Sequence, residues 1–343
     1  MKKICVAAAG TGGHVLPAFR FAKYAKDQGM EIVWVGGRRE IEKRYAEKIN
    51  AKFHSLSVTG IRGKNFYYTI KSLVNLVLST ALCVYYFCKE RPNFVVVFGG
   101  YISIPVGIAA IIFRINLFTH EQNTVLGTSN KLLSFFAKLN FLGLPLANES
   151  ISRAEIVGNP IGYFMKKTEL NNLDRIKIYV TGGSLGSDFI NSNIPSLLAD
   201  FSDRIKVVHQ CGNGYKNKTK ARYQGSIDAE VIEFIEEPLE KISWSDFVIS
   251  RAGALTLSEL IALGKPGIII PLPSAIDNHQ FFNAKYFSKI GMGFLFQENE
   301  DINKLQKFLV AMIVEKQFKN LCYTNEQDVP SEHLMLKRIL NHG

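Results

Sequence analysis

The sequence of 343 residues predicts an α/β protein made of two similar halves. In the first half, the apolar strand Ile4–Ala9 runs into a glycine turn, Gly10–Gly13, which is followed by a helix. The same order returns later, where the strand Arg175–Thr181 leads to the turn Gly182–Gly186 and to a helix from Asp188. A glycine turn between a strand and a helix is typical of sheets whose turn N–H groups bind a phosphate. The length leaves room for two hydrophobic cores.

Composition indicates a globular protein, since 47% of the residues are hydrophobic and 21% are charged. The formal net charge of +11 suits nucleic acid, an anionic membrane surface or a phosphate-bearing substrate as the partner. Five cysteines without a Cys-x-x-Cys pair argue against a disulfide framework and a zinc site, so a reducing cytosol is the expected compartment. No secretory signal is expected, because Lys2-Lys3 is followed directly by the first strand.

The first glycine turn does not fit the common nucleotide-binding signatures. A dinucleotide fingerprint needs a glycine where Val15 stands and an acid after the second strand, Glu31–Val35, which instead runs into Gly36–Arg39. No Gly-Lys-Ser/Thr closes the turn, so it is not a Walker A loop. A dehydrogenase is therefore disfavoured. The turn is either a phosphate cradle or a tight turn that needs positive φ, and the next helix is expected from about Pro17.

A long apolar segment, Phe66–Cys88, follows the expected strand Lys52–Thr59 and predicts a helix. Its apolar run Ser72–Cys88 is at the lower limit of the length that crosses a bilayer. Three interpretations remain open: a helix packed in the core, a helix lying on a membrane surface, and a transmembrane span. The basic residues around the run favour the membrane surface, although they also suit an ordinary solvated face. They are Arg62, Lys64, Lys71, Lys89 and Arg91.

A second glycine turn, Gly99-Gly100, closes the expected strand Phe94–Phe98 and precedes another helix. The short strand Leu117–Thr119 is then followed by four polar residues, His120–Asn123. Polar residues that follow a parallel strand lie at the edge of the sheet where ligands bind. Asn123 is expected either to bind a sugar hydroxyl or to cap the next helix.

One stretch of the second half suits a nucleotide. The turn Ser250–Gly253 opens a helix that carries Glu259 on its second turn and ends at Gly264-Lys265-Pro266. The free N–H groups at the start of a helix attract anions, at about 0.3–1 kcal/mol per charge. A carboxylate one turn further along can accept hydrogen bonds from the two hydroxyls of a ribose. The alternative is an ordinary αβ unit with a surface glutamate.

The other expected elements complete the second half. Val157–Pro160 is expected to mark the domain boundary, because glycine and proline interrupt regular structure there. Further strands are expected at Lys206–Gln210, Val231–Ile235 and Gly267–Ile270, and Trp244–Ile249 leads into the turn at Ser250. Helices are expected at Asp301–Lys319 and Leu334–Asn341.

Several motifs occur in an order that is typical of one enzyme family: Gly10-Thr11-Gly12-Gly13-His14, Gly99-Gly100-Tyr101, His120-Glu121-Gln122-Asn123, Gly158-Asn159-Pro160, Gly182-Gly183-Ser184-x-Gly186, Ser250-Arg251-x-Gly253-Ala254-Leu255-Thr256-x-Ser258-Glu259 and Asp277-Asn278-His279-Gln280. They resemble the MurG family, UDP-N-acetylglucosamine–N-acetylmuramyl-(pentapeptide) pyrophosphoryl-undecaprenol N-acetylglucosamine transferase. The resemblance covers nearly the whole chain and weakens after about Gln297.

The resemblance implies a GT-B glycosyltransferase fold, in which two Rossmann-like domains face a cleft. Residues 1–158, with a C-terminal helix at about 330–343 that crosses back, are expected to form an acceptor and membrane-facing domain. Residues 159–329 are expected to bind the UDP-sugar donor.

The resemblance also implies an activity. An inverting hexosyltransferase of this family moves N-acetylglucosamine from UDP-N-acetylglucosamine to the 4-hydroxyl of the muramoyl-pentapeptide on undecaprenyl diphosphate, converting lipid I to lipid II. This is a step of peptidoglycan synthesis, expected at the cytoplasmic face of the plasma membrane, with the protein bound peripherally to an anionic surface. No nucleic-acid partner, cofactor or metal is expected, and no Asp-x-Asp motif is present.

The resemblance assigns roles to single residues. Thr11, Gly12, Gly13 and Asn123 would line the sugar and diphosphate side, and Ser184 would contact the diphosphate. Ile235 would pack near the uracil, Glu259 would accept from the ribose hydroxyls, and Gln280 would hold the N-acetylglucosamine. Backbone N–H groups would come from Ala254, Leu255, Thr256, Leu257 and Ser258.

His14 is the hypothesised general base, because a histidine near its ordinary pKa can take a proton at neutral pH. The alternatives are that Glu121 is the base, or that His14 only binds phosphate or caps its helix. Two positions depart from the family: Gly162 stands where an arginine is common, and Ile104 where a glycine is usual. A UDP-N-acetylglucosamine 2-epimerase, another glycosyltransferase of this fold, and a non-enzymatic basic protein that binds membrane or nucleic acid remain the other functions to test.

Overall fold

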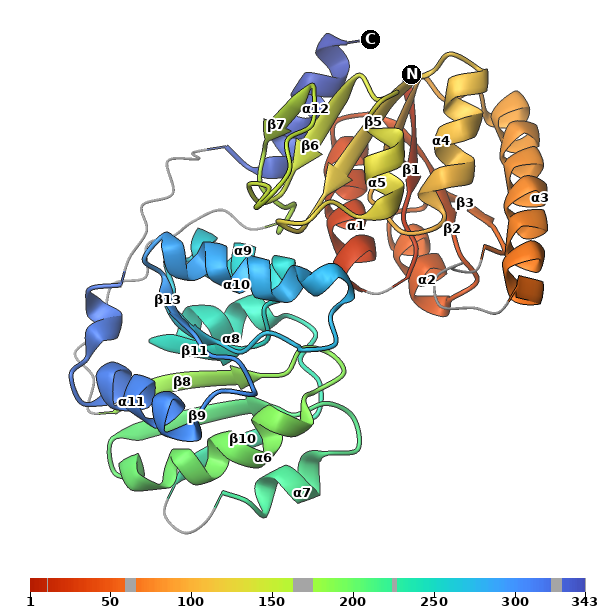
Figure 1. Ribbon diagram of the computed structural model, residues 1–343. Helices are drawn as coiled ribbons and strands as arrows, with labels where there is room; N and C mark the ends of the chain where they lie inside the picture. The colour runs from red at the N-terminus through yellow and green to blue at the C-terminus, as the bar shows by residue number, and fades with distance from the viewer. Residues whose placement is uncertain (11, 59–65, 163–174, 224–226, 322–328, 343) are drawn as a thin grey trace. The chain divides into compact units, whose positions relative to one another are not determined.

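The computed structural model describes residues 1–10, 12–58, 66–162, 175–223, 227–321 and 329–342. The chain forms two compact units, residues 1–163 with 329–343 and residues 164–328. Each unit is a parallel sheet covered by helices on both faces (Figure 1). The predicted α/β class with two Rossmann-like units is confirmed. The first unit extends slightly past the boundary expected at residue 158, and Asn159 Nδ2 donates to Gln122 O within it.

The sheet of the first unit has the strand order β3-β2-β1-β4-β5-β6-β7, and every pair is parallel. Its central strands are continuous apolar runs, because helices cover both of their faces. The strands are β1 Lys3–Ala7, β2 Glu31–Gly36, β3 Lys52–Ser55, β4 Phe94–Val97, β5 Asn116–Glu121, β6 Leu139–Leu142 and β7 Ala154–Ile156.

Two helical layers cover this sheet, and alternate strand residues belong to each layer. Ile4 and Val6 of β1 pack in a core with α1, α2 and α12, whereas Cys5 and Ala7 pack in a core with α3, α4 and α5. The helix α12 therefore completes the first unit although it ends the chain. The helices are α1 Gly12–Asp27, α2 Glu40–Lys48, α3 Phe66–Glu90, α4 Ser103–Ile112, α5 Thr128–Leu133 and α12 Ser331–Asn341.

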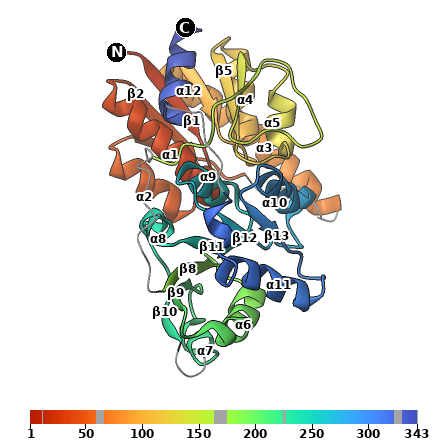
Figure 2. The same ribbon diagram turned by 90° about the vertical axis from the view of Figure 1, so that its left-hand side faces the viewer.

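The second unit repeats the design with the strand order β10-β9-β8-β11-β12-β13. Helices α6 and α11 pack on one face, and α8, α9 and α10 lie on the other (Figure 2). The strands are β8 Ile176–Thr181, β9 Ile205–Gln210, β10 Asp228–Ile232, β11 Phe247–Ser250, β12 Gly267–Ile269 and β13 Gly293–Leu295. The helices are α6 Asp188–Leu197, α7 Lys216–Lys220, α8 Pro238–Trp244, α9 Ala254–Ala262, α10 His279–Lys289 and α11 Ile302–Ile313, with short 3₁₀ turns at Ala199–Phe201, Ile276–Asn278 and Gln317–Lys319.

Several sequence expectations are wrong in their boundaries. The helix expected at Asp301–Lys319 ends at Ile313, and a separate 3₁₀ turn follows at Gln317–Lys319. The first helix begins at Gly12, and Pro17 lies inside it; the proline is tolerated because the carbonyl that its ring approaches is that of Gly13, near the helix start. The strand expected at Val231–Ile235 ends at Ile232, so Ile235 belongs to the following loop. His120 and Glu121 are the last residues of β5 and do not follow it.

Candidate active site

The glycine turns of the first unit meet at the point where the strand order reverses. Strand β1 is central, with β2 on one side and β4 on the other, and Ala7 pairs with Val97 at their carboxyl ends. The first glycine turn leaves β1 there and Gly99-Gly100 leaves β4. The crevice outside the carboxyl ends of the strands at such a reversal is where doubly wound sheets bind ligands.

His14 stands on the first turn of α1 beside these glycines. Its Nδ1 lies 2.8 Å from Oε1 of Gln122, which follows β5. Gly99 has φ of +89°, and a Cβ there would lie 3.2 Å from Cε1 of His14. Because Gly99 has no side chain, it leaves room for the imidazole of His14 and can adopt this positive φ without strain. His14 is partly exposed, so its side chain is accessible from solvent in this unit.

Glu121 is buried and both carboxylate oxygens accept hydrogen bonds. Oε1 accepts from the backbone N and Nδ2 of Asn123, both at 3.1 Å. Oε2 accepts from Gly127 N and Asn130 Nδ2, each at 2.9 Å. The carboxylate therefore holds the segment from Asn123 to Asn130 in place, and its lone pairs are already used. This arrangement favours His14 over Glu121 as the proton acceptor.

Glu42 of α2 is a site residue that sequence reasoning missed. Its side chain is buried, and Oε1 accepts from Gly10 N at 2.8 Å, which ties the first glycine turn to α2. A carboxylate that binds a turn from 32 residues away leaves no local pattern in the sequence. Gly12 and Gly13 open α1 beside this turn. Thr11, to which the resemblance gives a place on the sugar and diphosphate side, lies outside the described residues.

The second unit has an equivalent reversal between β8 and β11, where Thr181 pairs with Ser250. The loop after β8 is held tightly: Gly183 has φ of +82° and Gly186 φ of +76°. A Cβ on Gly186 would overlap the carbonyl oxygen of Cys211. Ser187 caps α6 by accepting from Ile190 N, whereas Ser184 projects from the loop and is exposed. The loop is therefore a fixed frame that exposes Ser184, while Gly183 N donates to Thr181 Oγ1 and Gly186 N to Gly183 O.

Helix α9 starts at the end of β11, next to this loop. Gly253 precedes it in an extended conformation, and the residues of its first turn, Ala254 to Leu257, carry no acid. Glu259 is 4% exposed, so it is not the surface glutamate of the alternative interpretation. Burial, and then the negative charge of Glu259, raise the pKa of Tyr179 on β8. Helix start and carboxylate thus lie on the same side of this unit as the β8 loop.

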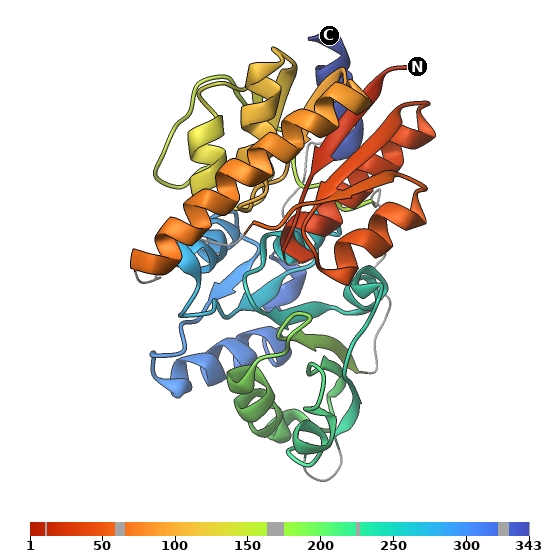
Figure 3. The ribbon, with the colours of Figure 1, turned by 90° about the vertical axis from the view of Figure 1, so that its right-hand side faces the viewer.

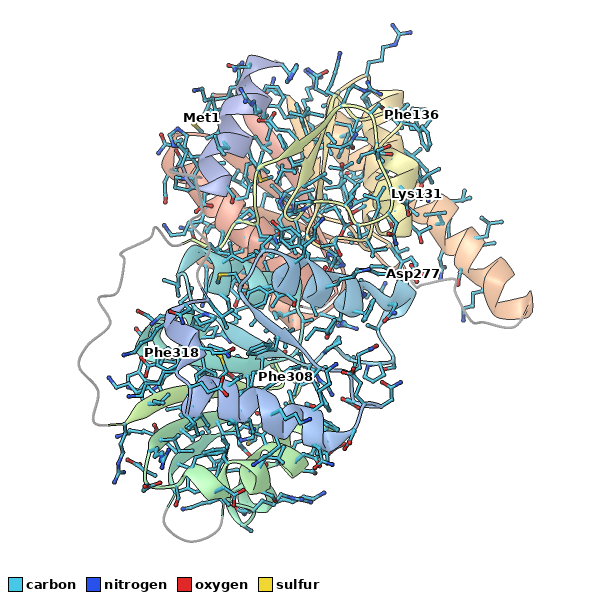
Figure 4. All side chains as sticks on the ribbon, turned by 60° about the vertical axis from the view of Figure 1, so that its left-hand side comes forward. Met1, Lys131, Phe136, Asp277, Phe308 and Phe318 are labelled. Carbon is cyan, nitrogen blue, oxygen red and sulfur yellow. The ribbon has the colours of Figure 1, made fainter. Side chains whose placement is uncertain are left out.

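The remaining predicted donor residues, Gln280 and Ile235, also belong to the second unit. Gln280 is the second residue of α10, and its Oε1 accepts from Leu272 N at 3.0 Å, while Asp277 precedes the helix with φ of +52° (Figure 4). A hollow of about 480 Å³ adjoins this loop, lined by Pro271, Leu272, Pro273, Asn278, Phe281, Gln297, Glu298 and Asn299. Ile235 follows β10 and is half-buried.

Arg251 and Asn283 are two further residues that sequence reasoning gave no role. Arg251 Nη1 donates to the carbonyls of Ile270 and Pro271, each at 3.2 Å, and Nη2 pairs with Glu298 at 2.5 Å. Asn283 Nδ2 donates to Ala252 O at 3.1 Å. Both side chains fix the turn that leads into α9. In the sequence, Arg251 and Asn283 were marked only by their closeness to Gly253 and Gln280, which belong to the recognised motifs.

Two positions depart from the family pattern, and the structure describes both. Gly162 has φ of +69° and lies against the side chain of Arg20, whose Nη1 approaches Pro160 O at 3.5 Å. Ile104 is in the first turn of α4 and is half-buried. Among the described residues, no group of three or more His, Cys, Asp or Glu side chains is placed to hold a metal ion.

Comparison with known proteins decides the family. The glycosyltransferase family 28 N-terminal domain matches residues 4–141, and the family 28 C-terminal domain matches residues 177–331. A UDP-N-acetylglucosamine–N-acetylmuramyl-(pentapeptide) pyrophosphoryl-undecaprenol N-acetylglucosamine transferase of Histophilus somni is 33% identical over 327 residues, covering 92% of this chain and 90% of its own. The chain belongs to the MurG family.

Structural similarity agrees with this membership of the MurG family. The crystal structure of Acinetobacter baumannii MurG has a TM-score of 0.83 and 27% identity, covering 99% of this chain and 100% of that one. The GT-B fold class is thereby confirmed for a MurG family member. A UDP-GlcNAc 2-epimerase from Neisseria meningitidis has a TM-score of 0.68 at 14% identity, covering 99% of this chain and 100% of that one. That likeness shows the fold alone.

Proposed function

We propose that this protein is an inverting transferase that moves N-acetylglucosamine from UDP-N-acetylglucosamine to the 4-hydroxyl of the muramoyl-pentapeptide on undecaprenyl diphosphate. The unit of residues 164–328 binds the donor, and the unit of residues 1–163 and 329–343 binds the lipid acceptor. One observation carries the proposal. Each unit has a glycine loop at its strand reversal; in the first unit this loop lies beside the partly exposed His14, and in the second it lies beside the start of α9, whose second turn carries the buried Glu259.

These side chains divide the chemistry between the two units. His14 Nε2 accepts the proton of the acceptor hydroxyl while its oxygen forms a bond to the anomeric carbon. The bond from that carbon to the β-phosphate oxygen breaks, and UDP leaves as an anion. The N–H groups at the start of α9 and of the Ser184 loop stabilise the departing diphosphate. Glu259 accepts from the ribose hydroxyls and Gln280 holds the N-acetylglucosamine, as the family pattern implies.

Transfer of radiolabelled N-acetylglucosamine from UDP-N-acetylglucosamine onto a lipid I analogue tests the function. The proposal expects a labelled product that depends on both substrates, with the anomeric configuration inverted. Incubation with the donor alone separates the main alternative, since a 2-epimerase would produce a new sugar isomer without any acceptor. A thermal shift with an oligonucleotide but none with UDP would instead favour the non-enzymatic nucleic-acid binder.

Gly186→Ala is expected to weaken UDP binding by at least about tenfold, as measured by calorimetric titration. The alanine would have to adopt the positive φ of Gly186, and its Cβ would overlap the carbonyl oxygen of Cys211. Backbone strain of this kind costs of order 1–3 kcal/mol. Gly214→Ala is the matched control: its φ is +80°, and a Cβ there meets nothing within 4 Å. Equal losses in the two variants would contradict the role given to the β8 loop.

The outer face of α3 supports peripheral binding to a membrane. Val77 and Leu78 are 63% and 62% exposed, whereas Ser72 and Ser79 on the inner face are buried. The helix thus turns its more apolar side toward solvent, and Figure 3 shows it along the outside of the first unit. The exposed apolar residues of α3 form one continuous stripe at helical spacing: Leu73, Val74, Val77, Leu78, Leu82 and Tyr85.

Neighbouring elements extend this apolar surface. Ile112 on α4, which packs against α3, and Phe135 and Phe136 after α5 are exposed; Figure 4 shows Phe136 and Lys131 at the outer side of α5. Among the described residues, Lys71–Glu90 is the one helix whose length and apolar composition would allow a membrane crossing. Its inner face packs in the core of the first unit through Cys83 and Phe87, so we propose that it lies on the cytoplasmic surface of the plasma membrane. Arg62 and Lys64 lie outside the described residues, while Lys71, Lys89 and Arg91 are exposed.

Replacing Val77 and Leu78 together with glutamate is expected to reduce co-sedimentation with phosphatidylglycerol vesicles by about tenfold or more. Burying such a side chain contributes about 1.5–3 kcal/mol, and the new acids are repelled by an anionic surface. Val314→Glu, at an exposed position of the second unit, is the control and should leave vesicle binding unchanged. Unchanged binding of the double variant would remove α3 from the membrane contact.

A further inference from the structure

A continuous chain of hydrogen bonds runs from the interior of the first unit to His14. His120 Nε2 lies 3.1 Å from Gly158 O, and His120 Nδ1 lies 3.0 Å from Gln122 Nε2. Gln122 Oε1 then lies 2.8 Å from His14 Nδ1. His120 and Gln122 are fully or almost fully buried, so water does not replace these partners. The chain connects the end of β5, the loop after β7 and the start of α1.

The surroundings of Gln122 fix which end of its amide faces His14. The other end lies 3.2 Å from Phe98 O and 3.2 Å from His120 O. A backbone carbonyl only accepts hydrogen bonds, so the atom facing two of them is the NH₂ group. The amide oxygen therefore faces His14. Because this oxygen is also only an acceptor, the proton of the contact belongs to Nδ1 of His14.

His120 is consistent with the same orientation. Its Nε2 faces the carbonyl of Gly158 and must carry a proton. Burial lowers the pKa of His120 to about 4, so the ring is neutral at physiological pH and its Nδ1 is a bare acceptor. That nitrogen accepts from Gln122 Nε2 and adds a third partner that holds the amide in one orientation.

We infer that Gln122 is a positioning residue that sets the tautomer of His14, with His120 as its buried support. Neutral His14 then carries its proton on Nδ1 and leaves Nε2 bare, which is the form able to accept a proton from a sugar hydroxyl. The side chain of a free histidine prefers the opposite tautomer, in which the proton is on Nε2. In that form Nε2 cannot accept a proton from the substrate. The catalytic part of this inference rests on the proposed function; the tautomer does not.

The choice of an amide has a chemical consequence. A carboxylate in place of Gln122 would face the carbonyl oxygens of Phe98 and His120 and would be repelled by them. The amide satisfies these acceptors with its NH₂ group and still presents an oxygen to His14. Asn159 holds the backbone of the same residue, since its Nδ2 donates to Gln122 O at 3.1 Å.

Two-bond ¹H–¹⁵N correlation spectra of the ¹⁵N-histidine-labelled protein without substrate test the tautomer at a pH where His14 is neutral. We expect His14 in the Nδ1–H form and His120 in the Nε2–H form. His209 serves as an internal reference in the Nε2–H form: Asn191 donates from Nδ2 to Cys211 O, so its Oδ1 faces His209 Nε2. A wild-type spectrum with His14 in the Nε2–H form would overturn the inference without any variant.

Gln122→Met keeps the length of the side chain and removes both polar ends. It is expected to move His14 toward the Nε2–H form. We expect kcat to fall by up to about 100-fold, the smallest contribution typical of a general base, and the KM for UDP-N-acetylglucosamine to stay unchanged. Gln210→Met, at a buried glutamine of the second unit that accepts from Tyr179 and donates to Gly183 O, should leave the His14 spectrum as in wild type. A shifted tautomer with unchanged kcat would end the positioning role. An inactive wild type with the expected spectrum would contradict the proposed function alone.

Discussion

His14→Ala is expected to lower turnover of the labelled-sugar assay by at least about 100-fold, because a positioned general base contributes 10²–10⁴-fold. The imidazole is a titratable group that the first unit places beside both glycine turns, partly exposed and with Nδ1 bound to Gln122. Removing it leaves most of the proposed donor contacts in place, since Ser184, Glu259 and Gln280 belong to the other unit. The KM for UDP-N-acetylglucosamine should therefore stay near its wild-type value.

His333→Ala is the control for this experiment, because His333 is an exposed histidine of α12 in the same unit. Its turnover should match wild type. Glu121→Gln gives the competing result: near wild-type turnover of His14→Ala, with a large loss in Glu121→Gln, would assign the base to Glu121. We expect Glu121→Gln to reduce stability instead, since its carboxylate accepts four hydrogen bonds within its own loop.

Glu259→Ala is expected to raise the KM for UDP-N-acetylglucosamine by about 10- to 100-fold. A hydrogen bond to a charged group contributes about 1.5–3 kcal/mol, which corresponds to this range of affinity. Because the ribose does not react, ground state and transition state lose the contact equally, so kcat should change little. Steady-state kinetics with the donor as the varied substrate measures the effect, and Glu259→Gln separates loss of charge from loss of volume.

Glu332→Gln is the matched control, since Glu332 is another buried carboxylate but lies on α12 of the first unit. It should leave the donor KM unchanged. Circular dichroism and melting of both variants show whether the fold survives the change. An unchanged donor KM in a folded Glu259→Ala protein would mean that this carboxylate serves the interior beside Tyr179 and does not bind the ribose. Uridine diphosphate bound away from Glu259 in a soaked crystal would also exclude the ribose contact.

Local sequence features predicted much of the architecture. The apolar runs and glycine turns indicated the central strands and the loops that leave β1, β4 and β8, because buried parallel strands have no polar alternation and sharp turns need glycine. The short strands β6, β7 and β13 were not predicted, because β6 and β7 are interrupted by Asn140 and Glu155 and β13 starts with a glycine, so none of them is a continuous apolar run. The helix starts at Gly12 and His279 were also missed, because glycine and proline near a helix end weaken its pattern.

The orientation of α3 shows a different limit. Periodicity identified a long apolar helix, but both of its faces contain apolar residues, and the pattern alone does not say which face the sheet covers. The structure buries the side with Ser72, Ser79 and Cys83 and exposes the side with Val77 and Leu78. The packing of α3 against α4 determines which face is buried. Because one face of α3 is packed against the protein, the helix is a candidate for lying on a membrane surface and not for crossing the membrane.

The sequence by itself determined the fold class, the two glycine-loop halves, the family and the identity of His14 and Glu259 as candidates, because each of these depends on residues close together in the chain. Only the tertiary structure decided how the first unit prepares its histidine. Gln122 meets His14 across 108 residues of sequence, Glu42 reaches Gly10 across 32, and α12 returns from the end of the chain to pack in the core with α1. Side-chain hydrogen bonds between distant segments form only after the sheet has brought strand ends together, so no local pattern encodes them.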